Sequence, residues 1–200
     1  MPIGELTIKN DDLGAIIGRV LEGEPGKINF DGTTTQEQFE DMIGTYALAI
    51  VNSGWAAGKD LDFSYDTLSD FPVAVASCYQ RSRKDRSEDL AVNATIKALA
   101  AYFFALSMNE HGLPWDVRFL PEKMRTNRLD PSIWGGVSRI TTGKKHKADF
   151  LLPVLEGCQK KKLFGKKILS FDLAALFKEY KTVTGVDLEQ HGLKSIAFDL

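Results

Sequence analysis

The chain has 200 residues, of which 44% are hydrophobic and 26% are charged, and its formal net charge is −2 at pH 7. This composition excludes a chain that is disordered throughout, and the length suits one domain that buries its own core. The two cysteines, Cys78 and Cys158, lie far apart, so we expect free thiols in a reducing compartment rather than a disulfide framework. We find neither a secretory signal nor an apolar run of membrane-spanning length, so we expect a cytoplasmic protein with no membrane partner.

The N-terminal part of the chain begins with a predicted strand, helix and second strand within residues 1–32. The clearest helix follows, since Thr35 suits an N-cap, Gln38 completes a capping box and an apolar stripe comes after them. A third helix is predicted over about 69–79. We interpret residues 81–86 as a charged loop.

The middle of the chain contains its most apolar helix. Ser87 is predicted to cap this helix, which covers about 88–109 and should be central because it is apolar on nearly all sides. Further helices are predicted over 122–128, over about 148–158 and after a cap at Ser170. A short strand is expected to close the chain.

Together these elements predict a mainly α fold. We expect a single helical globular domain over residues 1–200, with a few short peripheral strands. Residues 1–32 and 183–200 are expected to form mobile terminal arms. We find no internal repeat and no low-complexity tract in the sequence.

No complete catalytic or metal-binding motif is recognisable. The three histidines lack a second ligand at metal spacing, so neither a metal nor another cofactor is expected. The segment from Ser138 to Lys145 has the spacing of a phosphate-binding loop, but its first residue is not glycine and its last is not serine or threonine. We therefore expect a protein that is not an enzyme, with an enzyme of unrecognised motif as one alternative.

The small net charge conceals an uneven distribution of charge. Residues 1–75 carry 13 acidic and 4 basic side chains, whereas residues 118–167 carry 13 basic and 4 acidic ones. Lysine and arginine neutralise phosphodiesters, so this split indicates an anionic partner or another copy of the chain. The alternative is that folding interleaves the two parts and the charges cancel. The candidate nucleic-acid-binding residues are Arg81, Arg83, Lys84, Arg86, Lys123, Arg125, Arg128, Lys144 and Lys145.

Two blocks of the sequence resemble the coat proteins of flexuous filamentous plant viruses. The first is FEDMIGTYALAIVNSGW at residues 39–55. The second, ATIKALAAYFFA at residues 94–105, is similar to the central helix of that family, although Lys97 stands where the family prefers arginine. The Phe-Asp-Leu step at residues 171–173 resembles a later Phe-Asp-Phe of the family.

The resemblance implies a helical core that coats single-stranded RNA, with neighbouring copies joined by terminal arms. It also implies that Lys97 and Asp172 form a buried structural pair and that residues 81–86 lie near the RNA. We therefore predict a viral-type nucleocapsid or coat protein, located in the cytoplasm or in a virion, that binds single-stranded RNA non-specifically and self-assembles as a homo-oligomer. A protein-binding assembly module is the other alternative.

Overall fold

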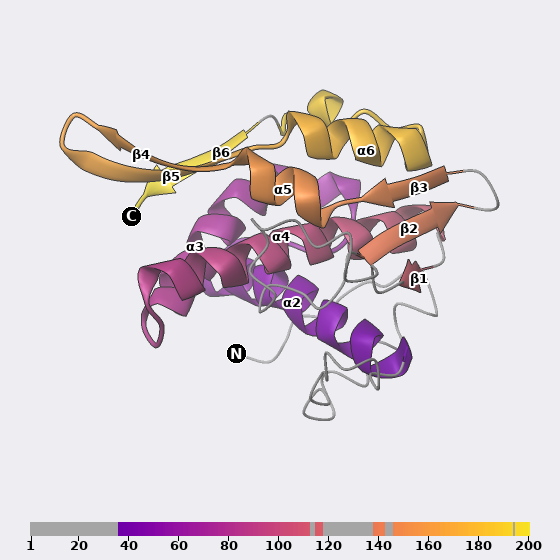
Figure 1. The fold of residues 1–200 in the computed structure, drawn as a ribbon, viewed down its shortest axis with the longest axis horizontal. Helices are drawn as coiled ribbons and strands as arrows, with labels where there is room; N and C mark the ends of the chain where they lie inside the picture. The colour runs from indigo at the N-terminus through magenta and orange to yellow at the C-terminus, as the bar shows by residue number, and fades with distance from the viewer. Residues whose placement is uncertain (1–35, 113–114, 118–137, 143–145, 194) are drawn as a thin grey trace, which may run out of the picture.

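Helices dominate the arrangement of elements in Figure 1. The computed structural model describes residues 36–112, 115–117, 138–142, 146–193 and 195–200. The elements are α2 (Gln36–Ala56), η1 (Tyr65–Asp70), α3 (Phe71–Arg83), α4 (Glu88–His111), β1 (Trp115–Val117), β2 (Ser138–Thr142), β3 (His146–Asp149), α5 (Leu151–Gly157), β4 (Cys158–Leu163), β5 (Lys166–Asp172), α6 (Ala174–Thr184), η3 (Leu188–His191) and β6 (Ser195–Asp199). The predicted mainly α fold is confirmed. The elements predicted within 1–32 and over 122–128 lie outside the described residues.

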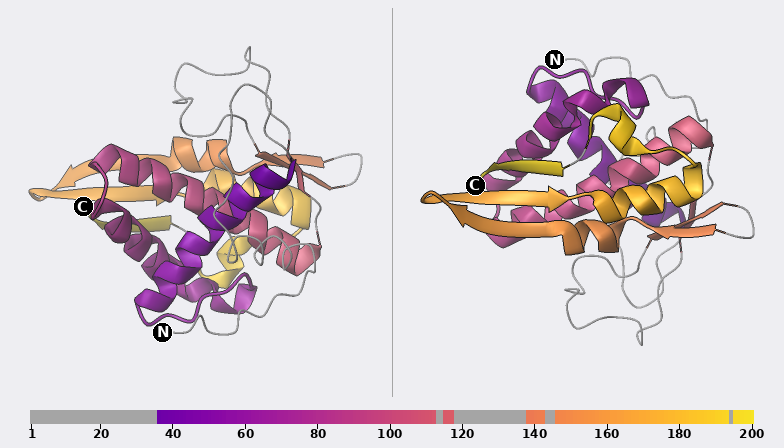
Figure 2. Two further views of the ribbon diagram at one scale, coloured as in Figure 1. Left: turned by 90° about the horizontal axis from the view of Figure 1, so that it is seen from below. Right: turned by 90° about the horizontal axis from the view of Figure 1, so that it is seen from above.

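The helix α4 is the centre of the fold. The hydroxyl of Ser87 caps it by accepting a hydrogen bond from the backbone N–H of Leu90, and Gly112 ends it in the left-handed conformation at φ 60°. Every residue of α4 from Thr95 to Asn109 is buried except Lys97. The helices α2, α3, α5 and α6 pack around it (Figures 1 and 2). The prediction of a central apolar helix is confirmed, because such a segment must be covered by other elements.

The length and composition of α4 would also allow it to cross a membrane. This differs from our expectation that no apolar run reaches membrane-spanning length. In the fold, 78% of the most apolar part of α4 is buried inside the protein. That environment is the one expected for the core helix of a globular domain.

Contacts between aromatic side chains connect α4 with α3, with the residue before α5 and, through that residue, with α6. The ring of Phe71 in α3 lies 4.6 Å from that of Tyr102. On another side of α4, the ring of Phe104 lies 4.9 Å from that of Phe150, which precedes α5. Phe150 in turn stacks at 5.7 Å on Tyr180 of α6. Contacts of this kind add about 0.5–1.5 kcal/mol per pair beyond burial, so they fix the relative positions of these helices.

A β-hairpin occupies the segment between the helix that we predicted over about 148–158 and the one that we predicted after Ser170. The predicted helix over 148–158 is shorter and covers only α5, after which β4 and β5 pair antiparallel with Leu163 opposite Lys166. Phe164 and Gly165 form the two-residue turn, with φ values of 47° and 84°, and such short hairpin turns require positive φ. Alternation of apolar and polar residues is limited to the end of β5, where Leu169 and Phe171 are buried, so periodicity did not indicate the lysine-rich hairpin.

The last residues of the chain pack against the helical body. The strand β6 pairs with β5, which confirms the predicted closing strand, and the side chains of Leu188 and Ile196 are buried. The described residues of the C-terminal segment, 183–193 and 195–200, therefore pack on the body, where we expected a mobile arm. Ser170 lies in β5 and is not a helix cap, because α6 begins four residues later at Ala174.

Candidate nucleic-acid interface

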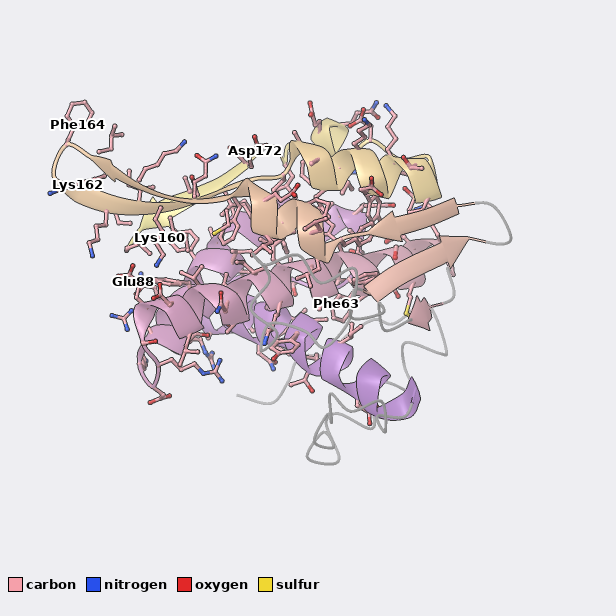
Figure 3. The ribbon with its side chains drawn as sticks, viewed as in Figure 1. Phe63, Glu88, Lys160, Lys162, Phe164 and Asp172 are labelled. Carbon is pink, nitrogen blue, oxygen red and sulfur yellow. The ribbon has the colours of Figure 1, made fainter. Side chains whose placement is uncertain are left out.

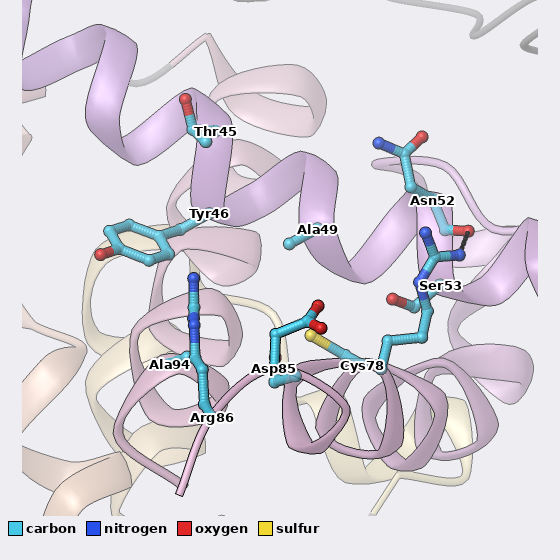
Figure 4. Close-up of a pocket in the computed structure, with 11 residues that line it drawn as sticks. Thr45, Tyr46, Ala49, Asn52, Ser53, Cys78, Asp85, Arg86 and Ala94 are labelled. Carbon is cyan, nitrogen blue, oxygen red and sulfur yellow. Dashed lines mark hydrogen bonds between the residues drawn. The ribbon is translucent and has the colours of Figure 1, made fainter. Parts of the chain in front are cut away.

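A pocket of about 360 Å³ lies between α2, α3 and the start of α4 (Figure 4). The helix α2 contributes Tyr46 and Asn52, and α3 contributes Arg81. The connection between α3 and α4 contributes Asp85 and Arg86. The wall therefore combines two guanidinium groups, an aromatic ring and one carboxylate.

The tight connection between α3 and α4 builds this pocket. Arg81 and Arg83 occupy the last turn of α3, where cations complement the negative end of the helix dipole. The guanidinium of Arg83 donates a hydrogen bond of 2.7 Å to the backbone carbonyl of Arg86, which holds the chain in its turn toward α4. Our interpretation of residues 81–86 as a loop is therefore corrected, since the first three of them are helical.

The cations of this connection are exposed. Arg81, Arg83, Lys84 and Arg86 are all exposed, and none forms an ion pair with a carboxylate in the described ranges of the chain. Arg81 donates one hydrogen bond of 3.4 Å to the backbone carbonyl of Asn52, drawn as a dashed line in Figure 4. Each guanidinium carries five N–H donors, so Arg81 and Arg86 retain donors for an anion.

Tyr46 supplies the aromatic part of the wall. Burial raises the pKa of Tyr46, and the nearby charge of Arg86 acts in the opposite direction, so the phenol is neutral near pH 7. The ammonium of Lys97 lies 5.4 Å from the ring centre and 3.5 Å from the hydroxyl oxygen. Tyr46 belongs to the apolar stripe that predicts this helix after Thr35, and only its hydroxyl indicated that this position borders a polar space.

The structure does not bring Lys97 and Asp172 together. Lys97 lies on the face of α4 that meets α2, whereas Asp172 is exposed at the end of β5 (Figure 3). The carboxylate of Asp172 accepts a hydrogen bond of 3.0 Å from the backbone N–H of Ala174. The buried pair implied by the resemblance is therefore corrected, because Asp172 satisfies a backbone donor in the first turn of α6.

The hairpin lysines differ from the cations of the pocket, because several are already paired. Lys160 lies 2.6 Å from Asp89 and 3.1 Å from Glu88, and Lys167 lies 3.7 Å from Glu88 (Figure 3). Hydrogen bonds from Lys160 lower the pKa of both carboxyl groups. The acids at the start of α4 thus neutralise part of the hairpin, while the cations of the α3–α4 connection have no ion pair among the described residues.

Cys78 also lines the pocket, but its thiol is not activated. Burial raises the pKa of Cys78 to about 11, so the group stays protonated near pH 7. A nucleophilic cysteine needs a lowered pKa, and Cys78 therefore acts as a wall residue. The remaining candidates, Lys123, Arg125, Arg128, Lys144 and Lys145, lie outside the described residues.

No protein-family model matches the chain, and comparisons with curated proteins and with solved structures found no match. In the described segments, no group of three or more His, Cys, Asp or Glu side chains is arranged to hold a metal ion. What the pocket binds must therefore be inferred from its own residues.

Proposed function

We propose that this protein binds single-stranded RNA without reading its sequence and self-assembles along it, as a viral-type nucleocapsid or coat protein does. The supporting observation is a pocket lined by Arg81, Arg86 and Tyr46, in which Arg86 lies beside the Tyr46 ring (Figure 4) and neither arginine has an ion pair with a described residue. Guanidinium groups bind phosphate, and an aromatic face stacks on a base of any identity. Their combination suits one nucleotide unit of a single strand.

The size and polarity of the pocket support this assignment. A volume of about 360 Å³ is near the lower end of ligand pockets, which span about 300–1,000 Å³, so it suits a single nucleotide unit. The carboxylate of Asp85 repels phosphate and accepts hydrogen bonds. Base amino groups and ribose hydroxyls are donors, so the part of the wall near Asp85 suits the base or the sugar.

The test is binding of a short, unstructured, fluorescently labelled RNA, measured by anisotropy at about 50 and 200 mM salt. Each phosphate contact contributes about 0.7 to the slope of log affinity against log salt for a single strand. We expect the double variant Arg81→Ala/Arg86→Ala to bind more weakly and to lose about 1.4 from this slope, if each arginine contacts one phosphate. Two RNAs of unrelated sequence should bind with similar affinity.

The matched control is the double variant Lys161→Ala/Lys162→Ala, which removes the same charge from the exposed hairpin. We expect it to keep the affinity and the salt slope of the wild type for the short RNA. Binding that is insensitive to salt, or equal losses in the two double variants, would contradict an RNA site at Arg81 and Arg86.

A further inference from the structure

The β4–β5 hairpin projects beyond the helical body and ends in two apolar side chains (Figures 1 and 3). Phe164 at the tip is 98% exposed, and Leu163 is 53% exposed. The strand β4 is also an edge of its sheet, and its residues from Gln159 to Leu163 are exposed. An exposed edge strand with an apolar tip is a surface through which chains associate.

The fold of one copy does not account for phenylalanine at the turn. Phe164 has φ 47°, in the left-handed region that disfavours bulky side chains, and asparagine, aspartate or glycine would suit this turn better. The 98% exposed ring also gains nothing from burial against the described residues. A contact outside the single copy therefore accounts best for Phe164.

The charges around the tip indicate the kind of partner. Lys161 and Lys162 are exposed and form no ion pair with the described residues, whereas Lys160, Lys166 and Lys167 pair with acids of the same chain. Two such cations are fewer than the roughly four to eight that hold a basic segment on an anionic membrane. An apolar tip with a small positive rim suits an acidic protein surface.

A complementary surface lies on the same chain, around the connection between α2 and α3. Asp60 and Asp66 are exposed there without ion pairs in the described part of the chain, and Val73 in the first turn of α3 is 42% exposed. We call Asp60, Asp66 and Val73 the acidic surface. Asp66 belongs to η1, whose Tyr65 contacts Tyr180 of α6, and α6 lies at the end of the molecule away from the hairpin tip (Figure 1).

We propose that the hairpin tip of one copy docks on the acidic surface of a second copy, with Phe164 against Val73 and the two tip lysines beside the two aspartates. Because the two surfaces differ and lie apart on the chain, the contact is heterologous and repeats from copy to copy. This inference rests on the self-assembly part of the proposed function. It uses none of the residues that line the RNA pocket.

The test is sedimentation velocity of the full chain without RNA, over a series of protein concentrations. We expect the wild type to associate as concentration rises, and Phe164→Asn to weaken association by about tenfold or more. Asparagine tolerates the left-handed turn, so the unfolding midpoint should stay equal or rise, which separates lost docking from lost folding. The control Leu90→Gln alters another exposed apolar side chain and should leave association unchanged.

Reversal of charge tests the partner surface. We expect Lys161→Glu/Lys162→Glu and Asp60→Lys/Asp66→Lys each to weaken association, and an equimolar mixture of the two variants to associate again through the re-paired charges. Association that is unaffected by Phe164→Asn, or a mixture that does not recover, would overturn the inference.

Two further outcomes separate this inference from the RNA proposal. A wild type that stays monomeric yet binds short RNA through Arg81 and Arg86 overturns the docking contact and leaves the RNA pocket standing. A variant Phe164→Asn that loses short-RNA binding while self-association is unchanged assigns the tip to RNA, and it likewise overturns the docking contact.

Discussion

The ammonium group of Lys97 lies 5.4 Å from the centre of the Tyr46 ring and 3.5 Å from its hydroxyl oxygen. This contact joins the central helix α4 to α2 beside the pocket. A cation over an aromatic face contributes about 0.5–1 kcal/mol at exposed sites and more when it is desolvated. Lys97 therefore helps to hold in place the ring that we propose as a stacking surface.

Substitution of Tyr46 separates stacking from this structural contact. We expect Tyr46→Phe to keep the affinity for short single-stranded RNA, because the ring remains and only the hydroxyl is lost. Tyr46→Ala should weaken binding by about 1–3 kcal/mol, the value of one base stacked on an aromatic side chain. Fluorescence anisotropy measures both, with circular dichroism as the folding control. Equal affinities for the two variants would contradict stacking on Tyr46.

Gly157 marks a close approach of two backbone segments. A Cβ atom at this position would lie 2.1 Å from the carbonyl oxygen of Asp172, so Gly157→Ala forces β5 away from the end of α5. We expect a loss of about 1–3 kcal/mol in the free energy of unfolding, as for other overpacked sites. Chemical denaturation measures it. The neighbouring exposed substitution Glu156→Ala should change stability by less than about 0.5 kcal/mol, and a similar result for Gly157→Ala would disprove the close contact.

We expect the free energy of unfolding to fall in acid because of the environment of His111. Its Nε2 lies 2.5 Å from the hydroxyl oxygen of Tyr65, which lies 2.9 Å from that of Tyr180. Burial lowers the pKa of His111, and the charge of Glu110 acts in the opposite direction. The unfolded chain, with a pKa of about 6.5, therefore takes up the proton first. The stability contributed by neutral His111 is complete above about pH 6.5 and falls as the pH drops below that value.

The measurement is chemical denaturation at about pH 7.5 and about pH 5.5, on either side of the unfolded pKa. We expect the wild type to lose more stability between these values than His111→Phe, which keeps a ring but cannot take up a proton. His191, which stacks on Tyr65 at 4.8 Å, is present in both proteins, so the difference isolates His111. Equal losses would show that His111 does not contribute to the pH dependence.

Local patterns in the sequence predicted the main helices. The apolar stripe after Thr35 corresponds to α2, and the cap at Ser87 with the apolar residues after it corresponds to α4. These features depend on neighbours within a few residues, so they can be recognised from the sequence alone. The hairpin around Phe164 was missed because β4 is exposed from Gln159 onward and the apolar alternation of β5 is limited to Leu169 and Phe171.

The candidate site was predicted only in part. The clustering of Arg81 and Arg86 was visible in the sequence, and the structure adds that both line one pocket. That pocket exists because α2 packs across α3 and α4, which brings Tyr46 to residues that follow it by more than thirty positions. Contacts over such separations are set by the packing of whole helices and not by local periodicity.

The sequence by itself determined the main helices α2, α3 and α4 and which of them is buried, because capping and apolar periodicity act between residues close together in the chain. Only the tertiary structure decided which charges are available. Lys160 and Lys167 pair with the acids at the start of α4, whereas Arg81 and Arg86 form no ion pair with a carboxylate of the described residues. Coulomb energy depends on distance in space, and the fold sets that distance.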